Sequence, residues 1–401
     1  MIWSKQQDNA LTAVAEWLRD PSSRPIFRLF GYAGSGKSTL AKYFAQMFGG
    51  DVKFASFTGK AALVMRRKGC EGASTIHSLI YTPVERDDGH FDFELNPESE
   101  LASADLLIVD ECSMVGDDLG RDVMSFGVPV LVLGDPAQLP PVKGAGFFTA
   151  VDKPDVMLTE IHRQAFDNPI IRMATAVRQG ERLTLGEHFG PNGVKSRVLA
   201  RADLVQSMVM KADQVLVGTN RTRMGTNAKM RAILGLPSDR PVEKDKVICL
   251  RNNREKNLLN GGIWNVEAAQ MTKHETSSFE VVDLMVAPPP EDAGAAKQIV
   301  KVPMSFFETG ECTLPPRVRR MFDEFTYGYA ITVHKSQGSQ WDHVTVFDES
   351  FSFGKMIESH SGADKGETFR RQWTYTAITR SAESVTVVQP DWYFQKRRTE
   401  T

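Results

Sequence analysis

A glycine-rich segment, GYAGSGKST at residues 31–39, constrains the fold of this chain more than any other feature. It matches the pattern GxxxxGK[ST] from Gly31 to Ser38. The apolar run PIFRLFG before it indicates a buried strand, and STLAKYFAQMF after it indicates a helix. A bare match can be accidental, but this strand, loop and helix context is the one in which backbone N–H groups close around phosphate. The segment therefore predicts a nucleotide-binding site.

Two side chains of this segment have distinct predicted roles. Lys37 is expected to reach the β- and γ-phosphates, and the Ser38 hydroxyl can ligate Mg²⁺. The positive end of the following helix points at the same anions. We predict that the nucleotide contacts Gly34, Ser35, Gly36, Lys37, Ser38 and Thr39.

The run LLIVDE at residues 106–111 is an apolar strand that ends in two carboxylates. Asp110 is expected to hold the Mg²⁺ water shell, and Glu111 to orient or deprotonate the attacking water. Hydrolysis needs both roles, whereas phosphate binding alone does not. An acidic strand end facing solvent is the alternative interpretation.

A further apolar strand leads into GDPAQLPPV at residues 134–142, a loop stiffened by prolines. Gln138 in this loop can donate or accept a hydrogen bond and thereby sense the γ-phosphate. The same residues are also compatible with nothing more than a rigid turn.

The order of apolar runs predicts an α/β fold. DVKFASF, DLLIVD and VPVLVLGD alternate with helical or loop-like sequence, as in a parallel sheet covered on both faces. A second αβ block begins near DNPIIRMATAVRQGE and resumes at EFTYGYAITV. Two insertions interrupt the blocks: a hairpin centred on DDGH, and a β-rich segment at about 269–324, for which a disordered linker is the alternative.

Composition narrows the setting of the protein. The net charge is -2, with 48 Lys and Arg against 50 Asp and Glu, so any basic surface must be local. Cys70, Cys112, Cys249 and Cys312 form no CxxC pair, which argues against a zinc site or a disulfide framework and favours a cytoplasmic location. The N-terminus is typical of an amphipathic helix rather than a signal peptide, and no apolar run approaches the roughly 20 residues of a membrane span.

Eight motifs occur in an order that resembles one known family. They are GYAGSGKST, SFTGKAA, TIHSL, VDECSM, GDPAQLPPV, LTEIHRQ, ITVHKSQGS and YTAITR. With them the chain resembles superfamily 1 DNA helicases, in the RecD/Dda-type branch, from Gln7 to Arg380. The resemblance implies a motor that uses ATP and Mg²⁺, moves 5′ to 3′ on single-stranded DNA and unwinds duplexes at junctions. A monomer in a bacterial or phage-infected cell, with replication or recombination proteins as possible partners, is the expected context.

The resemblance also implies the domain organisation. Residues 1–164 would form RecA-like domain 1A, with the hairpin at 81–104 as insertion 1B. Residues 165–268 and 325–401 would form RecA-like domain 2A. Residues 269–324 would form a small SH3-like insertion, 2B.

Five further nucleotide contacts follow from the resemblance. Gln7 resembles the glutamine that reads adenine, although the neighbouring Gln6 is an alternative, and so is an ordinary exposed helix residue. Arg163 and Arg380 resemble two arginines that reach the γ-phosphate, where a guanidinium offers forked geometry that lysine lacks. A surface salt bridge is the alternative for Arg380. Gly338 and Gln340 correspond to nucleotide contacts, with Gln340 standing where many relatives have glutamate.

The same resemblance predicts a track for single-stranded DNA. Such tracks hold phosphates with polar side chains and stack bases on aromatic rings. Phe57 is expected to stack on a base, although it can equally be a buried strand-end phenylalanine. For His77 a structural role is the alternative. The complete set of predicted DNA contacts is Phe57, Thr58, Lys60, His77, Thr332, His334 and Lys335.

The predicted hairpin is a candidate for the element that separates strands. His90, Phe91 and Phe93 lie near its tip, where an aromatic ring can replace a lost stacking partner. Aromatic residues that simply pack the hairpin are the alternative.

Three other functions remain to be weighed. A small-molecule kinase would need an acceptor site in place of HKSQGS and YTAITR, which speak against it. A non-enzymatic nucleic-acid-binding protein would be expected to lack Lys37, Glu111 or an arginine at the γ-phosphate. A motor that acts on RNA or anneals strands is harder to separate, since only contacts to the 2′ position distinguish the two substrates.

Overall fold

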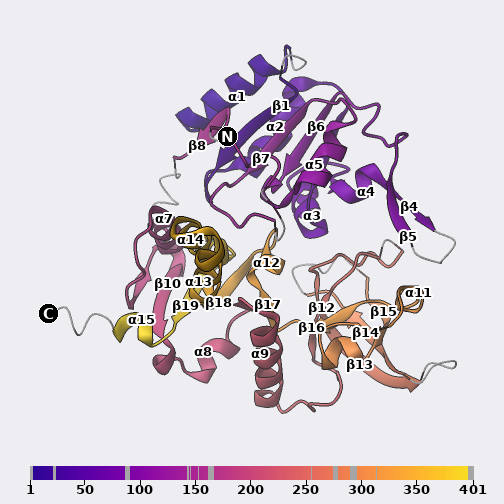
Figure 1. Cartoon of the computed structure of the whole chain (residues 1–401), viewed down its shortest axis with the longest axis vertical. Helices are drawn as coiled ribbons and strands as arrows, with labels where there is room; N and C mark the ends of the chain where they lie inside the picture. Colours follow the sequence, from indigo (N-terminus) through magenta and orange to yellow (C-terminus); the bar gives the residue numbers. More distant parts are fainter. Residues whose placement is uncertain are drawn as a thin grey trace. The chain divides into compact units, whose positions relative to one another are not determined.

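The computed structural model describes residues 3–20, 24–85, 91–141, 144, 146–151, 153–160, 167–253, 255–273, 279–289, 296–312 and 314–395. The chain forms two compact units (Figure 1). The first, the P-loop unit, consists of Met1–Arg86, Phe91–Arg197 and Ser350–Ser384. The second unit contains Val198–Glu349 and Val385–Thr401.

A six-stranded sheet with the order β3-β2-β6-β7-β1-β8 forms the centre of the P-loop unit. Its paired strands run parallel. Gly31, Ser56, Asp110 and Gly134 each end a strand, so they lie along one edge of the sheet, with Ser56 paired to Asp110. The strands are β1 (Ile26–Gly31), β2 (Val52–Ser56), β3 (Ser74–Thr75), β6 (Leu106–Asp110), β7 (Val130–Gly134) and β8 (Val156–Leu158).

Alternate side chains of these strands fill two cores, one on each face of the sheet. Leu29 and Ile108 belong to a core completed by helices α1, α2 and α3. Phe30 and Val109, one residue further on, belong to a core completed by α4 and α5. This confirms the prediction of a sheet covered on both faces, because successive side chains of a strand point in opposite directions. The helices are α1 (Lys5–Trp17), α2 (Lys37–Phe48), α3 (Gly59–Arg67), α4 (Ile76–Ile80) and α5 (Asp117–Met124).

The predicted hairpin is present as a two-stranded antiparallel sheet. Strand β4 (Tyr81–Glu85) pairs with β5 (Phe91–Leu95), from Tyr81 opposite Leu95 to Glu85 opposite Phe91. A hydrogen bond from the Tyr81 hydroxyl to the Asp122 carboxylate ties the base of the hairpin to helix α5.

A second six-stranded sheet has the order β17-β11-β18-β19-β10-β9. Strand β11 runs parallel to both β17 and β18. The chain passes between the two units within β10, after Arg197, and within β19, after Ser384. The strands are β9 (Gly186–Phe189), β10 (Lys195–Ala200), β11 (Gln214–Val217), β17 (Ala330–Thr332), β18 (Trp341–Phe347) and β19 (Ser381–Gln389), and the associated helices are α8 (Gln206–Met210), α9 (Asn220–Ile233), α12 (Val333–Ser336) and α15 (Trp392–Gln395).

The β-rich part of the second unit is larger than the insertion predicted at 269–324. It is an antiparallel sheet of five strands with the order β15-β14-β13-β12-β16, which begins at Lys246 and ends at Tyr327. Its buried side chains share one core with strand β11, which explains why the sequence boundaries fall inside the sheet. The SH3-like topology stays a prediction. The strands are β12 (Lys246–Cys249), β13 (Ile263–Lys273), β14 (Glu280–Ala287), β15 (Gln298–Pro303) and β16 (Phe325–Tyr327).

Two helices from the C-terminal part of the chain pack within the P-loop unit. They are α13 (Ser350–Ser361) and α14 (Ala363–Ile378), and α14 also packs on α7 (Pro169–Gln179). Gly366 allows the close approach of α13 and α14, since a Cβ there would lie 2.6 Å from the Gly354 carbonyl oxygen. The sequence predicts these helices in domain 2A with all of 325–401, whereas Ser350–Ser384 groups with the P-loop unit.

Four of the described helices begin at a threonine whose hydroxyl accepts a backbone N–H of the first turn. Thr58 caps α3, Thr75 caps α4, Thr219 caps α9 and Thr332 caps α12. Threonine satisfies an N–H that would otherwise lack a partner at a helix start. The cap therefore fixes each strand-to-helix turn.

Short helical turns connect the larger elements of the fold. The turns are η2 (Cys112–Met114), η3 (Pro191–Gly193), η4 (Arg201–Asp203), α10 (Ser305–Glu308) and α11 (Pro316–Arg319).

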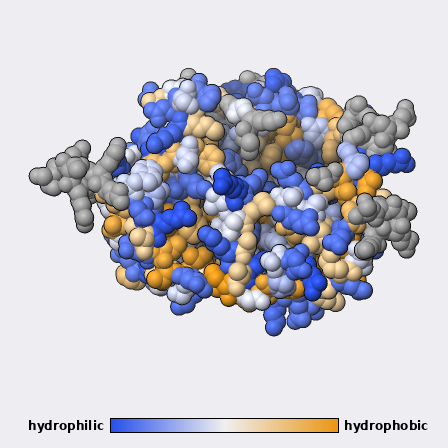
Figure 2. Space-filling view, turned by 60° about the horizontal axis from the view of Figure 1, so that its bottom comes forward, coloured by the Kyte–Doolittle hydropathy of each residue, from blue (hydrophilic) through white to orange (hydrophobic). Residues whose placement is uncertain are grey.

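The surface mixes hydrophobic and hydrophilic residues. On the face drawn in Figure 2, hydrophobic residues form small patches between hydrophilic ones. Among the described residues, no helix is long and apolar enough to cross a membrane.

Candidate active site

The glycine-rich loop joins strand β1 to helix α2. Gly34 and Gly36 both have φ of 82°, in the left-handed region that favours glycine. A Cβ on Gly31 would lie 2.6 Å from Ser35 Oγ and 2.8 Å from Leu158 Cβ, so the loop leaves no room for a side chain there. Because the N-cap of α2 is Gly36, its first turn receives no side-chain acceptor, and its N–H groups suit an anion. The loop therefore fits the phosphates of a nucleotide.

Polar side chains of the loop are placed around the same turn. The Lys37 ammonium donates hydrogen bonds to the carbonyl oxygens of Gly31 and Tyr32. Ser38 and Thr39 are half-buried in the first turn of α2. Ser35 Oγ is buried and has no hydrogen-bond partner within the described part of the chain. A phosphate oxygen would satisfy this hydroxyl.

The two carboxylates that end strand β6 lie in different environments. Asp110 is 5% exposed, and its Oδ1 accepts the Glu111 N–H at 2.8 Å. Glu111 has φ of 55°, a strained conformation for a non-glycine residue. Burial raises the pKa of Glu111, as do Asp110 and Asp135, while Arg380 and Lys37 lower it. Charged side chains from the N-terminal and the C-terminal parts of the chain therefore lie near Glu111.

A divalent ion at this edge would need ligands beyond the protein. The described residues contain no group of three or more His, Cys, Asp or Glu side chains that could hold a metal. Mg²⁺ commonly keeps several waters and takes one or two protein oxygens together with substrate phosphates. The Ser38 hydroxyl and the Asp110 carboxylate supply oxygens of this kind, so they fit such an ion.

A hydrogen-bond chain that the sequence did not predict links helix α14 to this site. The Tyr375 hydroxyl accepts the Ala33 N–H of the glycine-rich loop at 2.8 Å and donates to Asp135 Oδ2 at 2.7 Å. The Leu139 N–H also donates to Thr376 Oγ1 at 2.9 Å. Asp135 and Tyr375 lie inside motifs quoted above, so their polarity at a strand end and in an apolar run was the available signal.

Gln138 and Arg380 are both buried in the P-loop unit. Gln138 is 6% exposed, and its Oε1 has no hydrogen-bond partner among the described residues. Arg380 is also 6% exposed, and its guanidinium donates to the Thr376 carbonyl oxygen and to Thr379 Oγ1 at the end of α14. Burial at this level does not fit a surface salt bridge for Arg380. Arg163 lies outside the described residues.

The two glutamines of helix α1 contact different parts of the protein. Gln7 Oε1 accepts the Ser4 N–H in a capping box, and Gln7 Nε2 donates to the Ser35 carbonyl oxygen at 3.1 Å. Gln6 Oε1 accepts the N–H groups of Thr159 and Glu160. Gln7 is therefore buried against the glycine-rich loop, and the alternative of an ordinary exposed residue is wrong for it. Its adenine-reading role stays a prediction.

The DNA contacts predicted in the P-loop unit are close together. Phe57 and His77 meet edge to face with ring centroids 5.9 Å apart, and His77 lies 5.7 Å from the Tyr81 ring. Phe57 is half-buried and packs on the core beneath the sheet. Thr58 and Lys60 follow at the start of α3, where N–H groups also favour phosphate. Stacking and core packing are therefore both available to Phe57.

The DNA contacts predicted in the second unit surround the start of α12. Thr332 ends β17 and caps α12, on which His334 and Lys335 lie. Burial lowers the pKa of His334, so the ring is neutral near neutral pH.

Two residues predicted to contact the nucleotide follow α12 in the chain. Gly338 has φ of 73°, and Gln340 is exposed.

The residues predicted for strand separation are only partly described. Phe93 lies on β5 and is 66% exposed. Phe91 begins the same strand, opposite Glu85. His90 lies outside the described residues. The exposure of Phe93 does not fit an aromatic ring that simply packs the hairpin.

Comparison with known families and proteins shows which proteins this chain is similar to. A family model described as an AAA domain matches residues 3–193, and a model of the UvrD-like helicase C-terminal domain matches residues 327–388. The ATP-dependent RecD2 DNA helicase of Deinococcus radiodurans is 30% identical over 385 residues, which cover 88% of this chain and 46% of that protein. The ATP-dependent DNA helicase dda of Enterobacteria phage T4 is 30% identical over 190 residues, which cover 44% of this chain and 42% of that protein.

The alignments span less than half the length of both curated relatives. A solved Pif1 helicase structure, described as a basis for DNA unwinding at forked duplexes, has a TM-score of 0.55 and 20% identity and covers 100% of this chain and 97% of that one. This likeness shows the fold, with two RecA-like domains. The two family models and the two curated relatives show that the chain is similar to the superfamily 1 helicases, in the branch that contains RecD2 and Dda.

Proposed function

We propose that this chain is an ATP-driven motor that moves 5′ to 3′ along single-stranded DNA and unwinds the duplex at junctions. The names of the relatives, both ATP-dependent DNA helicases, support the activity and the substrate. The polarity rests on the family branch alone. Four free cysteines support a reducing, cytoplasmic setting for this activity.

One observation carries the proposal: helix α14, from the C-terminal part of the chain, is hydrogen-bonded to the glycine-rich loop. The Tyr375 hydroxyl accepts the Ala33 N–H of the loop and donates to Asp135, and Arg380 is buried just after the same helix. A phosphate-binding protein needs only the loop. The half-buried Glu111 carboxylate and the buried Arg380 guanidinium are groups of the kind that hydrolysis of the γ-phosphate requires.

Each residue has a role in the proposed hydrolysis. Lys37 holds the β- and γ-phosphates, and the Ser38 hydroxyl and Asp110 hold the metal. Mg²⁺ supplies charge neutralisation at the phosphates when bound. Glu111 orients the attacking water and takes its proton, and Arg380 stabilises the charge that develops at the γ-phosphate. Arg163 joins Arg380 in this proposal.

Sensing of the nucleotide is assigned to the loop after strand β7. The unpartnered Gln138 Oε1 supports a role as a hydrogen-bonding sensor of bound nucleotide. Its neighbours Asp135 and Leu139 contact Tyr375 and Thr376 on α14. A conformational change at Gln138 would thereby be passed to helix α14, which ends just before Arg380.

We assign strand binding to the polar and aromatic residues of both units. Phe57 stacks on a base, Thr58 and Lys60 hold phosphate at the start of α3, and Thr332 does the same at the start of α12. The exposed Phe93 supports a role for the hairpin in separating strands. His77, His334 and Lys335 complete the proposed track.

The decisive experiment is steady-state ATP hydrolysis with and without a single-stranded DNA oligonucleotide. RNA of the same sequence and a blunt duplex serve as comparisons, and Lys37→Ala controls for contaminating hydrolysis. We expect stimulation by single-stranded DNA and little by the duplex. Equal stimulation by RNA would indicate an RNA-directed motor instead. Hydrolysis that ignores every nucleic acid would contradict the proposal. Duplexes with 5′ or 3′ tails then test the polarity.

A further inference from the structure

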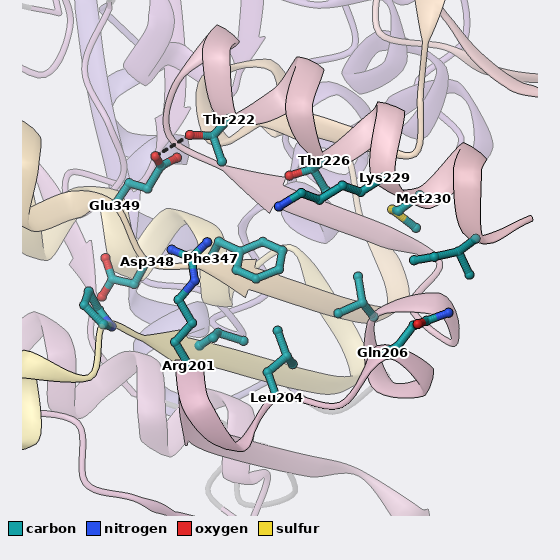
Figure 3. Close-up of a pocket in the computed structure, with 14 residues that line it drawn as sticks. Arg201, Leu204, Gln206, Thr222, Thr226, Lys229, Met230, Phe347, Asp348 and Glu349 are labelled. Atoms are coloured by element: carbon teal, nitrogen blue, oxygen red, sulfur yellow. Dashed lines mark hydrogen bonds between the residues drawn. The ribbon is translucent and has the colours of Figure 1, made fainter. Parts of the chain in front are cut away.

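A pocket of about 390 Å³ in the second unit is lined by none of the residues assigned to hydrolysis or to the DNA track. It lies between helix α9, helix α8 and the ends of strands β18 and β19 (Figure 3). Its volume is in the range of sites that bind small ligands or single side chains. Neither the proposed hydrolysis nor the proposed DNA track uses the polar and apolar side chains that line it.

One part of the lining is apolar. Leu204, Val209, Met230, Ile233 and Val388 contribute to it, and Phe347 adds one aromatic ring. Ile233 remains 43% exposed although it lies on the pocket wall. An apolar group of a ligand would remove this surface from water, which is favourable in proportion to the area covered.

Two cationic side chains point into the pocket. Figure 3 shows Arg201, from turn η4, and Lys229, from α9, entering from opposite sides toward Phe347. Both residues are exposed. Neither has a hydrogen bond or an ion pair with any residue that the structure describes. Two cations without partners beside an apolar wall are complementary to an anion that carries an apolar group.

The two carboxylates of the pocket already have partners. Glu349 Oε2 accepts the Gly218 N–H, and Glu349 Oε1 accepts the Thr222 hydroxyl at 2.6 Å. Asp348 Oδ2 accepts Gln389 Nε2 at 2.7 Å. They still carry negative charge, which disfavours a polyanion such as a nucleic-acid backbone more than a single carboxylate. The aliphatic wall also lacks the series of aromatic faces on which bases stack.

We propose that this pocket binds a short peptide of a partner protein that presents an apolar side chain next to a carboxylate. The apolar side chain fills the aliphatic part of the pocket, and Arg201 and Lys229 bind the carboxylate. The site is separate from the proposed hydrolysis and strand-binding residues. Peptide binding is therefore expected to be independent of ATP and of single-stranded DNA.

The test uses the full chain and two short peptides that differ only in charge. The probes are fluorescein-labelled Gly-Gly-Phe-Leu-Asp-amide and Gly-Gly-Phe-Leu-Asn-amide, measured by fluorescence anisotropy. We expect the acidic peptide to bind about tenfold more tightly. The variant R201Q/K229Q should lose this preference. Arg221 is exposed on helix α9, which also carries Lys229, but it does not line the pocket. The control Arg221→Gln therefore removes one charge outside the pocket and should leave peptide binding unchanged.

Three results would overturn the proposal. They are equal binding of the two peptides, an unchanged preference in R201Q/K229Q, and an equal loss in the Arg221→Gln control. Single-stranded DNA affinity is measured on the same variants. If R201Q/K229Q weakened binding of a labelled oligothymidine as much as binding of the acidic peptide, the pocket would belong to the nucleic-acid track instead. DNA-stimulated ATP hydrolysis by R201Q/K229Q should equal that of the parent, which also shows that the variant is folded.

Discussion

Replacing Tyr375 with phenylalanine removes one oxygen atom from the contact between helix α14 and the glycine-rich loop. That oxygen accepts the Ala33 N–H and donates to Asp135, whose side chain is 1% exposed. Burial raises the pKa of Tyr375 well above its ordinary value, so the hydroxyl stays protonated as a donor throughout the neutral range. The phenyl ring retains its packing. The variant therefore isolates the two hydrogen bonds.

The expected magnitude follows from the two groups left without a partner. A buried donor or acceptor that loses its partner costs about 1–3 kcal/mol, so the loss of two partners should lower the stability of the P-loop unit by about 2–6 kcal/mol. Asp135 keeps the Ala137 N–H on its other oxygen, which places the estimate toward the lower end. If about 1.4 kcal/mol of this loss appears in the placement of Arg380, kcat for ATP should fall about tenfold.

Thermal unfolding and DNA-stimulated ATP hydrolysis measure the two effects. Tyr43→Phe is the matched control, because Tyr43 packs edge to face on Trp3 and its hydroxyl has no hydrogen-bond partner among the described residues. The control should leave the unfolding temperature and kcat unchanged. A Tyr375→Phe protein with the unfolding temperature and kcat of the parent would refute the proposed link between α14 and the loop.

Further substitutions test the base, its titration, the strand contact and the hairpin. Glu111→Gln should lower kcat by about 10²–10⁴-fold while nucleotide binding, followed by fluorescence titration, persists, and retained hydrolysis would exclude Glu111 as the base. Because burial raises the pKa of Glu111 and hydrolysis needs its ionised form, kcat should decline on acidification at a pH above about 4.3, and a midpoint at or below that pH would contradict this. Thr58→Asp keeps a good helix cap but repels phosphate, so the unfolding temperature should hold while single-strand affinity falls, whereas Thr58→Ser should match the parent; equal affinity in both would exclude the phosphate contact. Phe91→Ala combined with Phe93→Ala should reduce unwinding of a tailed duplex more than ATP hydrolysis, and equal losses would refute a strand-separating role.

Local patterns predicted the parts of the fold that depend on neighbours in the sequence. The loop from Gly31 to Ser38, the strand that ends at Asp110 and the hairpin each follow from spacing and hydrophobicity within a short window. The placement of α13 and α14 in the P-loop unit did not follow. It depends on contacts such as that between Tyr375 and Asp135, which are 240 positions apart in the sequence.

The extent of the antiparallel sheet was missed for a similar reason. Its outer strand β16 has three residues and pairs with β12, so Cys249 lies opposite Phe325. Such short strands have little periodicity of their own. The motif assigns Gln7 to the nucleotide base, whereas its hydrogen bond to the Ser35 carbonyl oxygen depends on the packing of helix α1 against the loop.

The position of Arg380 directly before strand β19 has a mechanical consequence. Ser381 begins this strand of nine residues, which extends about 30 Å at roughly 3.3 Å per residue. Val385 and Val387 are fully buried along it, so packing holds the strand in place. Arg380 is joined to the strand directly, without an intervening loop. A displacement of the first residue of β19 would therefore be passed directly to the backbone of Arg380.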